Sequence, residues 1–204
     1  MRKRSALWPM ALAAVAVELA LYRRWHQRWG ATSDEVAAPM PGDERVPSSQ
    51  FTATRALTID APPSTVWTWL VQVGIGRAGF YSYDRLDNPG RHSSDEVIVE
   101  WQHPQVGDVA APMVDPLREG MYFRLKTLDE PRELLWTKAD STWSWRLTPV
   151  DDGRRTRLVT RLRQHYDWRS LGVLATVTLL EVGDFPMMRR MLLGIRDRSE
   201  SAAR

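Results

Sequence analysis

The sequence contains no cysteine among its 204 residues. This absence excludes disulfide bonds, thiolate zinc sites, cysteine-ligated iron–sulfur clusters and a cysteine nucleophile. Lysine is also scarce, because 25 of the 28 basic residues are arginines, and the net charge is only +3. An arginine excess of this kind fits a GC-rich genome better than a nucleic-acid surface, so no nucleic-acid partner is expected. The four histidines have no metal-ligand spacing, and neither a metal nor a cofactor is predicted.

Long apolar runs are scarce, and the one near the N-terminus is 17 residues long, from Ala6 to Tyr22. That length is at the short end of what spans the roughly 30 Å hydrocarbon core of a bilayer. Tryptophans near its ends are typical of membrane-interface anchors, namely Trp8, Trp25 and Trp29. Residues 1–29 are therefore predicted to form an N-terminal apolar helix that contacts a membrane through residues 6–28. A soluble helix and a cleaved signal peptide are the alternatives.

Residues 30–50 differ from both neighbouring segments in composition. They are rich in proline, serine, glycine and acidic residues, and they show no apolar period. The composition predicts a disordered linker. The folded domain is then expected to cover residues 51–200.

The rest of the chain has the strand and helix patterns of an α+β domain. Apolar and polar residues alternate over residues 51–60, which indicates a half-buried strand. Two prolines then open a helix, because proline is tolerated in the first helical turn. Antiparallel strands are predicted at 97–101, 107–113, 121–128, 132–138, 142–149 and 155–166. The last two strands are joined by the hairpin signal Asp151-Asp152-Gly153. The C-terminal part is predicted to be a long helix, with an apolar stretch over 171–182 and a kink near 183–186.

Tryptophan is the compositional outlier, with ten copies. So many large aromatics exceed what a small sheet needs for its core, which favours a hydrophobic ligand cavity. The predicted lining residues are Tyr81, Tyr83, Trp101, Trp136, Trp143 and Trp145. On the last strand, Arg157, Arg161 and Arg163 share one face. That face is either a solvated outer face of the sheet or a site that recognises a carboxylate or phosphate.

Several segments together resemble the SRPBCC superfamily, the START and polyketide cyclase-like group of proteins. They are Ile59–Leu70, Gly76–Asn88, Val106–Asp108, Trp143–Leu147 with Thr156–Arg163, and Met188–Arg196. Within the second segment, Arg-Ala-Gly-Phe-Tyr-Ser-Tyr-Asp is similar to a block of one bacterial subgroup that is largely without assigned chemistry. The resemblance implies a helix-grip fold, in which a curved antiparallel sheet of six or seven strands surrounds a long C-terminal helix. It also implies a deep apolar cavity between the sheet and the helix.

Two functions remain open at this point. The first is the non-enzymatic binding or carriage of a hydrophobic small molecule, lipid or polyketide-like, in an aromatic-lined cavity of a membrane-associated protein. The alternative is a polyketide cyclase-like or dehydratase-like enzyme, with Asp84, Tyr83 and Arg161 as the candidates for acid–base work and enolate stabilisation. The Gly76–Asn88 block is predicted to gate one end of the cavity, with Asp84 in a structural role. A soluble cytoplasmic protein is the alternative to membrane association.

Overall fold

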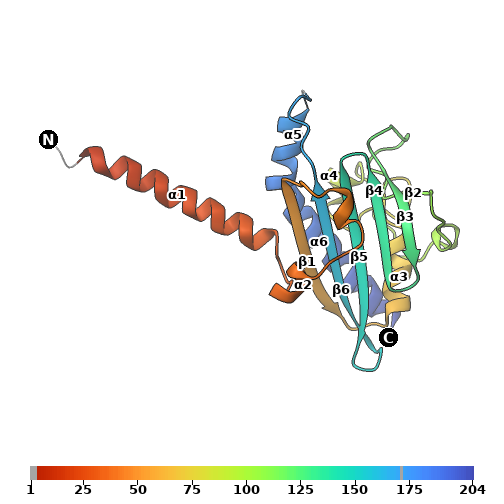
Figure 1. The fold of residues 1–204 in the computed structure, drawn as a ribbon. Helices are drawn as coiled ribbons and strands as arrows, with labels where there is room; N and C mark the ends of the chain where they lie inside the picture. The colour runs from red at the N-terminus through yellow and green to blue at the C-terminus, as the bar shows by residue number, and fades with distance from the viewer. Residues whose placement is uncertain (1–3, 171) are drawn as a thin grey trace.

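One antiparallel sheet and the helices packed on it form the domain (Figure 1). The computed structural model describes residues 4–170 and 172–204. The strands are β1 (Phe51–Ile59), β2 (Val109–Ala110), β3 (Phe123–Asp129), β4 (Glu133–Lys138), β5 (Ser141–Val150) and β6 (Arg155–Gln164). They pair in the order β1-β6-β5-β4-β3-β2, and each pair is antiparallel. The predicted α+β class, with an antiparallel sheet and a long C-terminal helix, is confirmed.

The β5–β6 hairpin forms where the sequence predicts it. Val150 pairs with Arg155, and the residues between them include Asp151, Asp152 and Gly153 with φ of 51°, 57° and 82°. Aspartate and glycine adopt this left-handed region more readily than most residues. The turn sets the register of β6, which also pairs with β1 along its whole length and so joins the first strand to the last.

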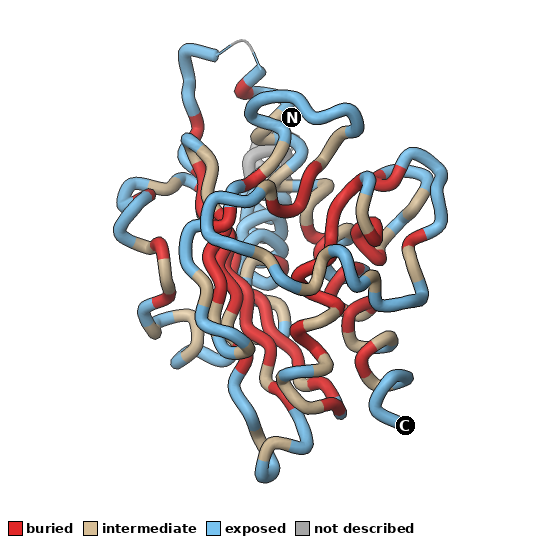
Figure 2. Tube along the Cα trace, turned by 90° about the vertical axis from the view of Figure 1, so that its right-hand side faces the viewer, coloured by how far each residue is buried: buried red, intermediate tan, exposed pale blue. Residues whose placement is uncertain are grey.

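Two helices cover one face of the sheet, called the inner face below. They are α3 (Pro63–Val71) and α6 (Asp184–Ala202), and α3 opens with the predicted prolines. The stripe predicted on the C-terminal helix is buried against α3 and the sheet: Met188, Met191, Leu192 and Ile195. Figure 2 shows the buried residues gathered along the central strands. The core therefore lies between the inner face and these two helices.

The C-terminal helix is irregular rather than broken. It starts as α5 (Val173–Thr178), continues through the π-helical turn η3 (Leu179–Gly183) and proceeds into α6. A π-helical turn inserts extra backbone into the helical ladder, and the irregularity lies just before the predicted kink at 183–186. Leu171, where the predicted apolar stretch begins, lies outside the described residues.

The N-terminal helix α1 (Arg4–His26) is continuous and projects away from the domain (Figure 1). Leu12, Val15 and Leu19 on it are more than half exposed and do not enter the core. Its C-terminal end is docked, because the Arg23 guanidinium donates to both oxygens of Glu181 at 2.7 and 2.8 Å. Within the described residues, none of the helices combines the length and the hydropathy needed to cross a bilayer.

The segment predicted to be a disordered linker is an ordered strap, here residues 30–50, across the outer face of the sheet. It contains the short helices α2 (Ser33–Ala37) and η1 (Asp43–Arg45), and it buries Met40 and Val46. Acidic side chains of the strap bind arginines of β6 that lie 122 and 118 residues away in the sequence. The residues that hold the strap to the sheet are irregularly spaced, so they show no helical or strand period. Composition alone therefore led to the wrong prediction of a disordered linker.

The strand predicted at residues 97–101 is also wrong. These residues contain the 3₁₀ turn η2 (Val99–Trp101). The side chain of Gln72 takes the place of a neighbouring strand, because its Oε1 accepts from the backbone N–H of Ile98 at 2.8 Å and its Nε2 donates to the carbonyl of Glu96 at 3.1 Å. A side chain that satisfies the backbone in this way removes the need for a ladder partner.

Candidate functional site

An open groove of about 780 Å³ lies between residues 82–86 and one side of α6. Its wall includes the start of the short helix α4 (Asp84–Asp87). The volume falls within the range of roughly 300–1,000 Å³ that is usual for small-molecule sites. The lining residues are Ser82, Tyr83, Asp84, Arg85, Leu86, Arg189, Arg190 and Leu193.

The wall of the groove is held against α6 by close backbone contacts. Gly194 of α6 allows this approach, because a Cβ at that position would lie 2.3 Å from the carbonyl oxygen of Tyr81. Ser82 adds a hydrogen bond, since its Oγ donates to the carbonyl of Met187 at 3.0 Å. The wall is therefore anchored to α6, and its position is set by the same helix that lines the opposite side of the groove.

Tyr81 supports the wall and does not line the groove. It is buried with a left-handed φ of 56°, which costs energy for a bulky residue. Its hydroxyl donates to the carbonyl of Trp69 at 3.1 Å and accepts from Gln72 Nε2 at 2.8 Å. The guanidinium of Arg198 lies 4.5 Å from the ring centroid. Burial raises the pKa of Tyr81 well above its usual value, so this phenol stays neutral.

Asp84 braces the same wall. Its carboxylate accepts from Ser93 Oγ at 2.5 Å, and Ser93 Oγ in turn accepts from the backbone N–H of Tyr81 at 3.1 Å. The carbonyl of Asp84 accepts from the backbone N–H groups of Asn88 and Gly90 at 3.2 and 2.8 Å. These bonds fix the turn that follows α4. Although Asp84 borders the groove, its carboxylate is engaged in this structural network.

Asp87 is a second carboxylate in the wall, and it is buried. Neither of its oxygens has a hydrogen-bond partner among the described residues. Burial raises the pKa of Asp87 because the charged form loses its hydration. Asp87 is not among the residues predicted from the sequence, since an aspartate in a short polar turn gives no signal of burial.

The groove combines apolar contact surface with positive charge. Tyr83 and Leu86 are exposed on one side, and Leu193 contributes from α6. The cationic side chains are Arg85, Arg189 and Arg190. The single carboxylate lining the groove is that of Asp84, so the lining carries an excess of two positive charges. This arrangement suits a molecule with an apolar body and an anionic group.

The aromatic interior predicted to hold a ligand is filled by its own side chains. Trp136, Trp143 and Trp145 are buried and pack with ring centroids 5.1 to 5.5 Å apart. The Nε1 of Trp143 donates to Thr160 Oγ1 at 2.9 Å, which satisfies its polar atom. The void next to Trp136, between β2, β3, β4 and the end of α3, measures about 10 Å³. That is about the space of one water molecule.

The remaining predicted lining residues are dispersed. Trp101 lies in η2, where the guanidinium of Arg77 stacks over its ring at 4.2 Å. Tyr83 lies in the groove and Tyr81 behind its wall. The structure thus brings the three sheet tryptophans together and leaves Tyr81, Tyr83 and Trp101 outside that cluster.

Arg161 lies on the outer face of the sheet, away from Asp84 and Tyr83. It is 4% exposed, and its guanidinium is saturated by the strap. It donates to Asp43 at 2.6 Å, to Thr54 Oγ1 at 2.8 Å and to three strap carbonyls at 2.9 to 3.0 Å. The expectation of a solvated arginine face is therefore wrong for this residue. The three candidate catalytic residues are not brought together, because the sheet and α6 separate Arg161 from the groove.

Sequence reasoning also missed the α6 side of the groove, formed by Arg189, Arg190 and Leu193. A signal was present, because the buried stripe on this helix leaves those three positions on the opposite side. The pattern shows that Arg189 and Arg190 face away from the core, while Leu193 lies at its margin. Only the fold shows that residues 82–86 lie next to them.

Comparison with known proteins gives structural neighbours alone. No protein-family model matches the chain, and no curated protein matches it in sequence. Protein SSP2350 from Staphylococcus saprophyticus is 13% identical with a TM-score of 0.44, over 75% of this chain and 94% of that chain. The Aha1 dimer from Colwellia psychrerythraea is 12% identical with a TM-score of 0.42, over 74% and 97%. CalU16 from Micromonospora echinospora is 18% identical with a TM-score of 0.33, over 74% and 84%.

Structural similarity with TM-scores of 0.33 to 0.44 and identities of 12% to 18% does not indicate a ligand or a reaction for this protein. The fold class follows from the sheet order and the helix placement described above. Membership of the SRPBCC superfamily stays a prediction from the sequence.

Proposed function

We propose that this protein binds a hydrophobic small molecule bearing an anionic group in the groove between residues 82–86 and α6. The observation that carries the proposal is the meeting of exposed Tyr83 and Leu86 with three arginines around one open volume of about 780 Å³. Fatty acids and aromatic carboxylic acids belong to the class of ligand that this lining suits.

Apolar contact and charge have separate roles in this proposal. Burial of the ligand's apolar body against Tyr83, Leu86 and Leu193 supplies affinity at roughly 25 cal/mol per Å². Arginine guanidinium groups pair bidentately with carboxylates and phosphates, so Arg189 and Arg190 fix the orientation of the ligand. Arg190 is exposed in the groove and makes no hydrogen bond or ion pair with another described residue, which leaves its donors available.

Carriage rather than catalysis is the function that the groove supports. Acid–base chemistry needs a titrating group within reach of the substrate, and the Asp84 carboxylate already accepts from Ser93. The proposed enolate stabiliser, Arg161, is saturated by strap groups on the other face of the sheet. Of the three candidates for the polyketide cyclase-like alternative, Tyr83 and Asp84 line the groove and Arg161 does not, so the predicted set is not assembled there.

Calorimetric titration of the full chain with decanoate and with decanol tests the proposal. Decanoate is expected to bind more tightly, and Arg190→Gln is expected to weaken decanoate about tenfold or more while leaving decanol unchanged. Arg196→Gln is the matched control, because Arg196 is on the same helix outside the groove. Any contact between the probe and the apolar side chains of α1 is common to all variants and cancels in the comparison.

Equal decanoate binding by Arg190→Gln and Arg196→Gln would place the carboxylate elsewhere and refute the site. Equal affinity of the wild-type chain for decanoate and decanol would refute the anionic specificity. Leu86→Ser adds an independent check, since it should weaken both probes if the apolar body lies in the groove.

A further inference from the structure

A second pocket lies where α1 leaves the domain, and it is separate from the groove. Its volume is about 310 Å³. It is lined by residues of α1's end, the strap, β1 and β6: Arg23, Gln27, Arg28, Val36, Ser49, Gln50, Thr52, Thr54, Arg161 and Arg163. It is called the junction pocket below.

The junction pocket is positively charged even after its internal ion pairs are counted. Four guanidinium groups line it, and two carboxylates are paired with them. Glu181 binds Arg23, and Asp43 lies 2.6 Å from Arg161 and 3.7 Å from Arg163. The balance is an excess of two positive charges, so the pocket favours an anion.

Hydrogen-bond donors remain unused in this pocket. The Arg28 side chain makes no hydrogen bond or ion pair with another residue in the described ranges, and it is exposed. Gln27 Nε2 is buried and has no partner among the described residues. A buried donor without an acceptor is costly, which makes a ligand oxygen the natural partner. Phosphate oxygens accept from arginine and amide donors at the same time.

Apolar surface adjoins the junction pocket. The exposed side chains of α1 include Leu12, Val15, Val17, Leu19 and Leu21. Glu18 is the single charged residue between Leu12 and Tyr22, so most of this exposed surface is apolar and favours an apolar cover. The segment from α5 to η3 adds exposed Leu174, Leu179 and Val182 on the side of the domain from which α1 projects (Figure 1).

The depth of the pocket relative to this apolar surface fits a bilayer. Gln27 continues the helical hydrogen bonding of α1, since its backbone N–H donates to the Arg23 carbonyl at 3.1 Å. It lies six residues beyond Leu21, which corresponds to about 9 Å along the axis. The headgroup layer of a bilayer is roughly 5–8 Å deep on each side. Whatever the tilt of α1 against the bilayer, contact of Leu21 with the acyl chains keeps Gln27 within about 9 Å of that depth, and therefore near the lipid phosphates.

We infer that the junction pocket binds the phosphate of an anionic phospholipid headgroup, with α1 and the α5–η3 surface in contact with the same bilayer. Arg28 and Gln27 donate to the phosphate, and Arg163, which shares Asp43 with Arg161, supplies further positive charge. This inference does not depend on the proposed function of the groove, because none of the groove residues lines the junction pocket.

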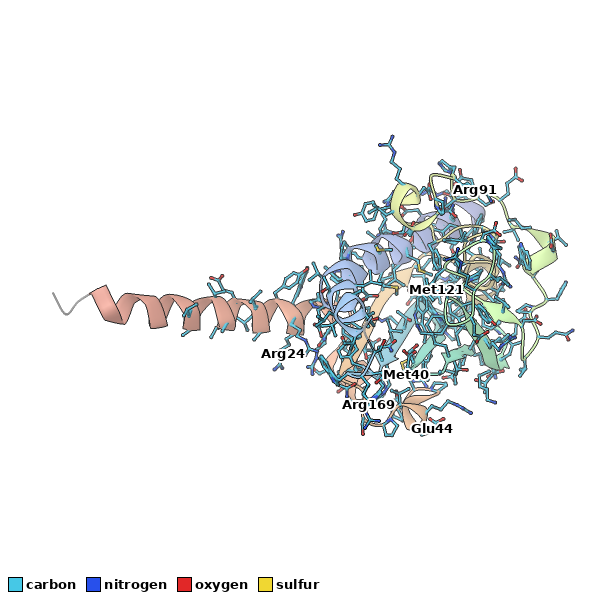
Figure 3. The ribbon with its side chains drawn as sticks, turned by 90° about the horizontal axis from the view of Figure 1, so that it is seen from above. Arg24, Met40, Glu44, Arg91, Met121 and Arg169 are labelled. Carbon is cyan, nitrogen blue, oxygen red and sulfur yellow. The ribbon has the colours of Figure 1, made fainter. Side chains whose placement is uncertain are left out.

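The test is flotation of the full chain, made by cell-free synthesis, with vesicles of phosphatidylcholine alone or with added phosphatidylglycerol. The measured quantity is the ratio of binding to the two vesicle types, in which the apolar contribution of α1 cancels. Arg28→Gln is compared with Arg24→Gln, because Arg24 carries the same charge on the same helix end (Figure 3) but does not line the pocket. Melting temperatures of both variants check that the fold is unchanged.

Arg24→Gln is expected to lower the ratio about fivefold, the general effect of one basic residue near an anionic surface. Arg28→Gln is expected to lower it about tenfold further, because it also removes charge-assisted hydrogen bonds. An equal decrease of the binding ratio in the two variants would show that Arg28 acts only through its charge. That result would overturn phosphate binding in the junction pocket.

A second arm distinguishes a lipid phosphate from a free one. Inorganic phosphate is titrated into the wild-type chain and both variants by calorimetry. Arg28-dependent phosphate binding without an Arg28-dependent vesicle ratio would assign the pocket to a soluble phosphate and overturn the lipid source. An Arg28-dependent vesicle ratio supports the inference whether or not inorganic phosphate binds measurably.

Discussion

Replacing Arg161 by methionine is expected to detach the strap, residues 30–50, from the outer face of the sheet. The substitution keeps the apolar stem but removes the five hydrogen bonds that Arg161 itself donates, four to the strap and one to Thr54 Oγ1. Deleting one partner of a buried, hydrogen-bonded ion pair typically costs about 3–5 kcal/mol. The expected loss of stability is smaller than the sum of five charge-assisted hydrogen bonds of about 1.5–3 kcal/mol each. When the strap detaches, Asp43 and the strap carbonyls form hydrogen bonds with water instead, and these offset part of the loss. Such a loss lowers the melting temperature of a chain this long by about 6–20 °C.

Thermal unfolding and amide hydrogen exchange on the strap measure the two parts of this prediction. The full chain in a mild detergent is compared with Arg154→Met, an arginine at the exposed β5–β6 turn. Arg161→Met should melt lower and lose protection over residues 34–46, while the control does neither. The reasoning is refuted if Arg161→Met melts within about 2 °C of wild type, as a neutral surface change does, and the strap amides stay protected.

Three further predictions concern the wall of the groove. Gly194→Ala is expected to destabilise the folded protein by about 1–3 kcal/mol, because its Cβ would meet the Tyr81 carbonyl. Gly183→Ala is the control and should not destabilise it, since the Cβ there would face a flexible side chain. Equal melting temperatures of the two variants would contradict the close approach of Gly194 to Tyr81. Burial raises the pKa of Asp87, so the folded state holds its proton more tightly and stability falls as pH rises from the unfolded value of about 3.9 through the folded pKa. Asp87→Asn should therefore melt above wild type at neutral pH and lose that advantage near pH 3, about one unit below the unfolded value, and a pH-independent difference would rule out its charge as the cause. Asp84→Ala should destabilise by about 1–3 kcal/mol in urea unfolding with decanoate affinity retained in the folded protein, and unchanged stability would show that the brace is not needed.

Local patterns predicted the elements of this fold well. The alternation of β1, the paired prolines before α3 and the aspartate–glycine turn between β5 and β6 each express a local backbone preference. Such preferences act within a few residues, so a sequence window contains all that is needed. The strand predicted at 97–101 failed for the opposite reason, because Gln72 supplies its hydrogen-bond partners from a distant helix end.

The candidate site was predicted only in part. The Gly76–Asn88 block contributes Tyr83 and Asp84 to the groove, as its dense aromatic and polar composition suggested. The predicted aromatic cavity is filled. Trp143 and Trp145 of β5 pack against Trp136 of β4 and occupy the space that they were expected to line. Alternation predicts which face a side chain takes, but the distance across the core decides whether a void remains.

The sequence by itself determined the strand pattern and the buried stripe of the C-terminal helix, because each follows from the period of side chains along one element. It also determined the apolar character of α1, which follows from the composition of one continuous run. The tertiary structure decided the rest. It turned residues 30–50 from a supposed linker into a strap, since Glu35 and Asp43 bind arginines more than 100 residues away. It likewise made the groove and the junction pocket, each of which joins elements that are remote in sequence. Hydrogen bonds and charges between such elements depend on distances in space, and those distances exist only once the sheet, the strap and the helices have packed together.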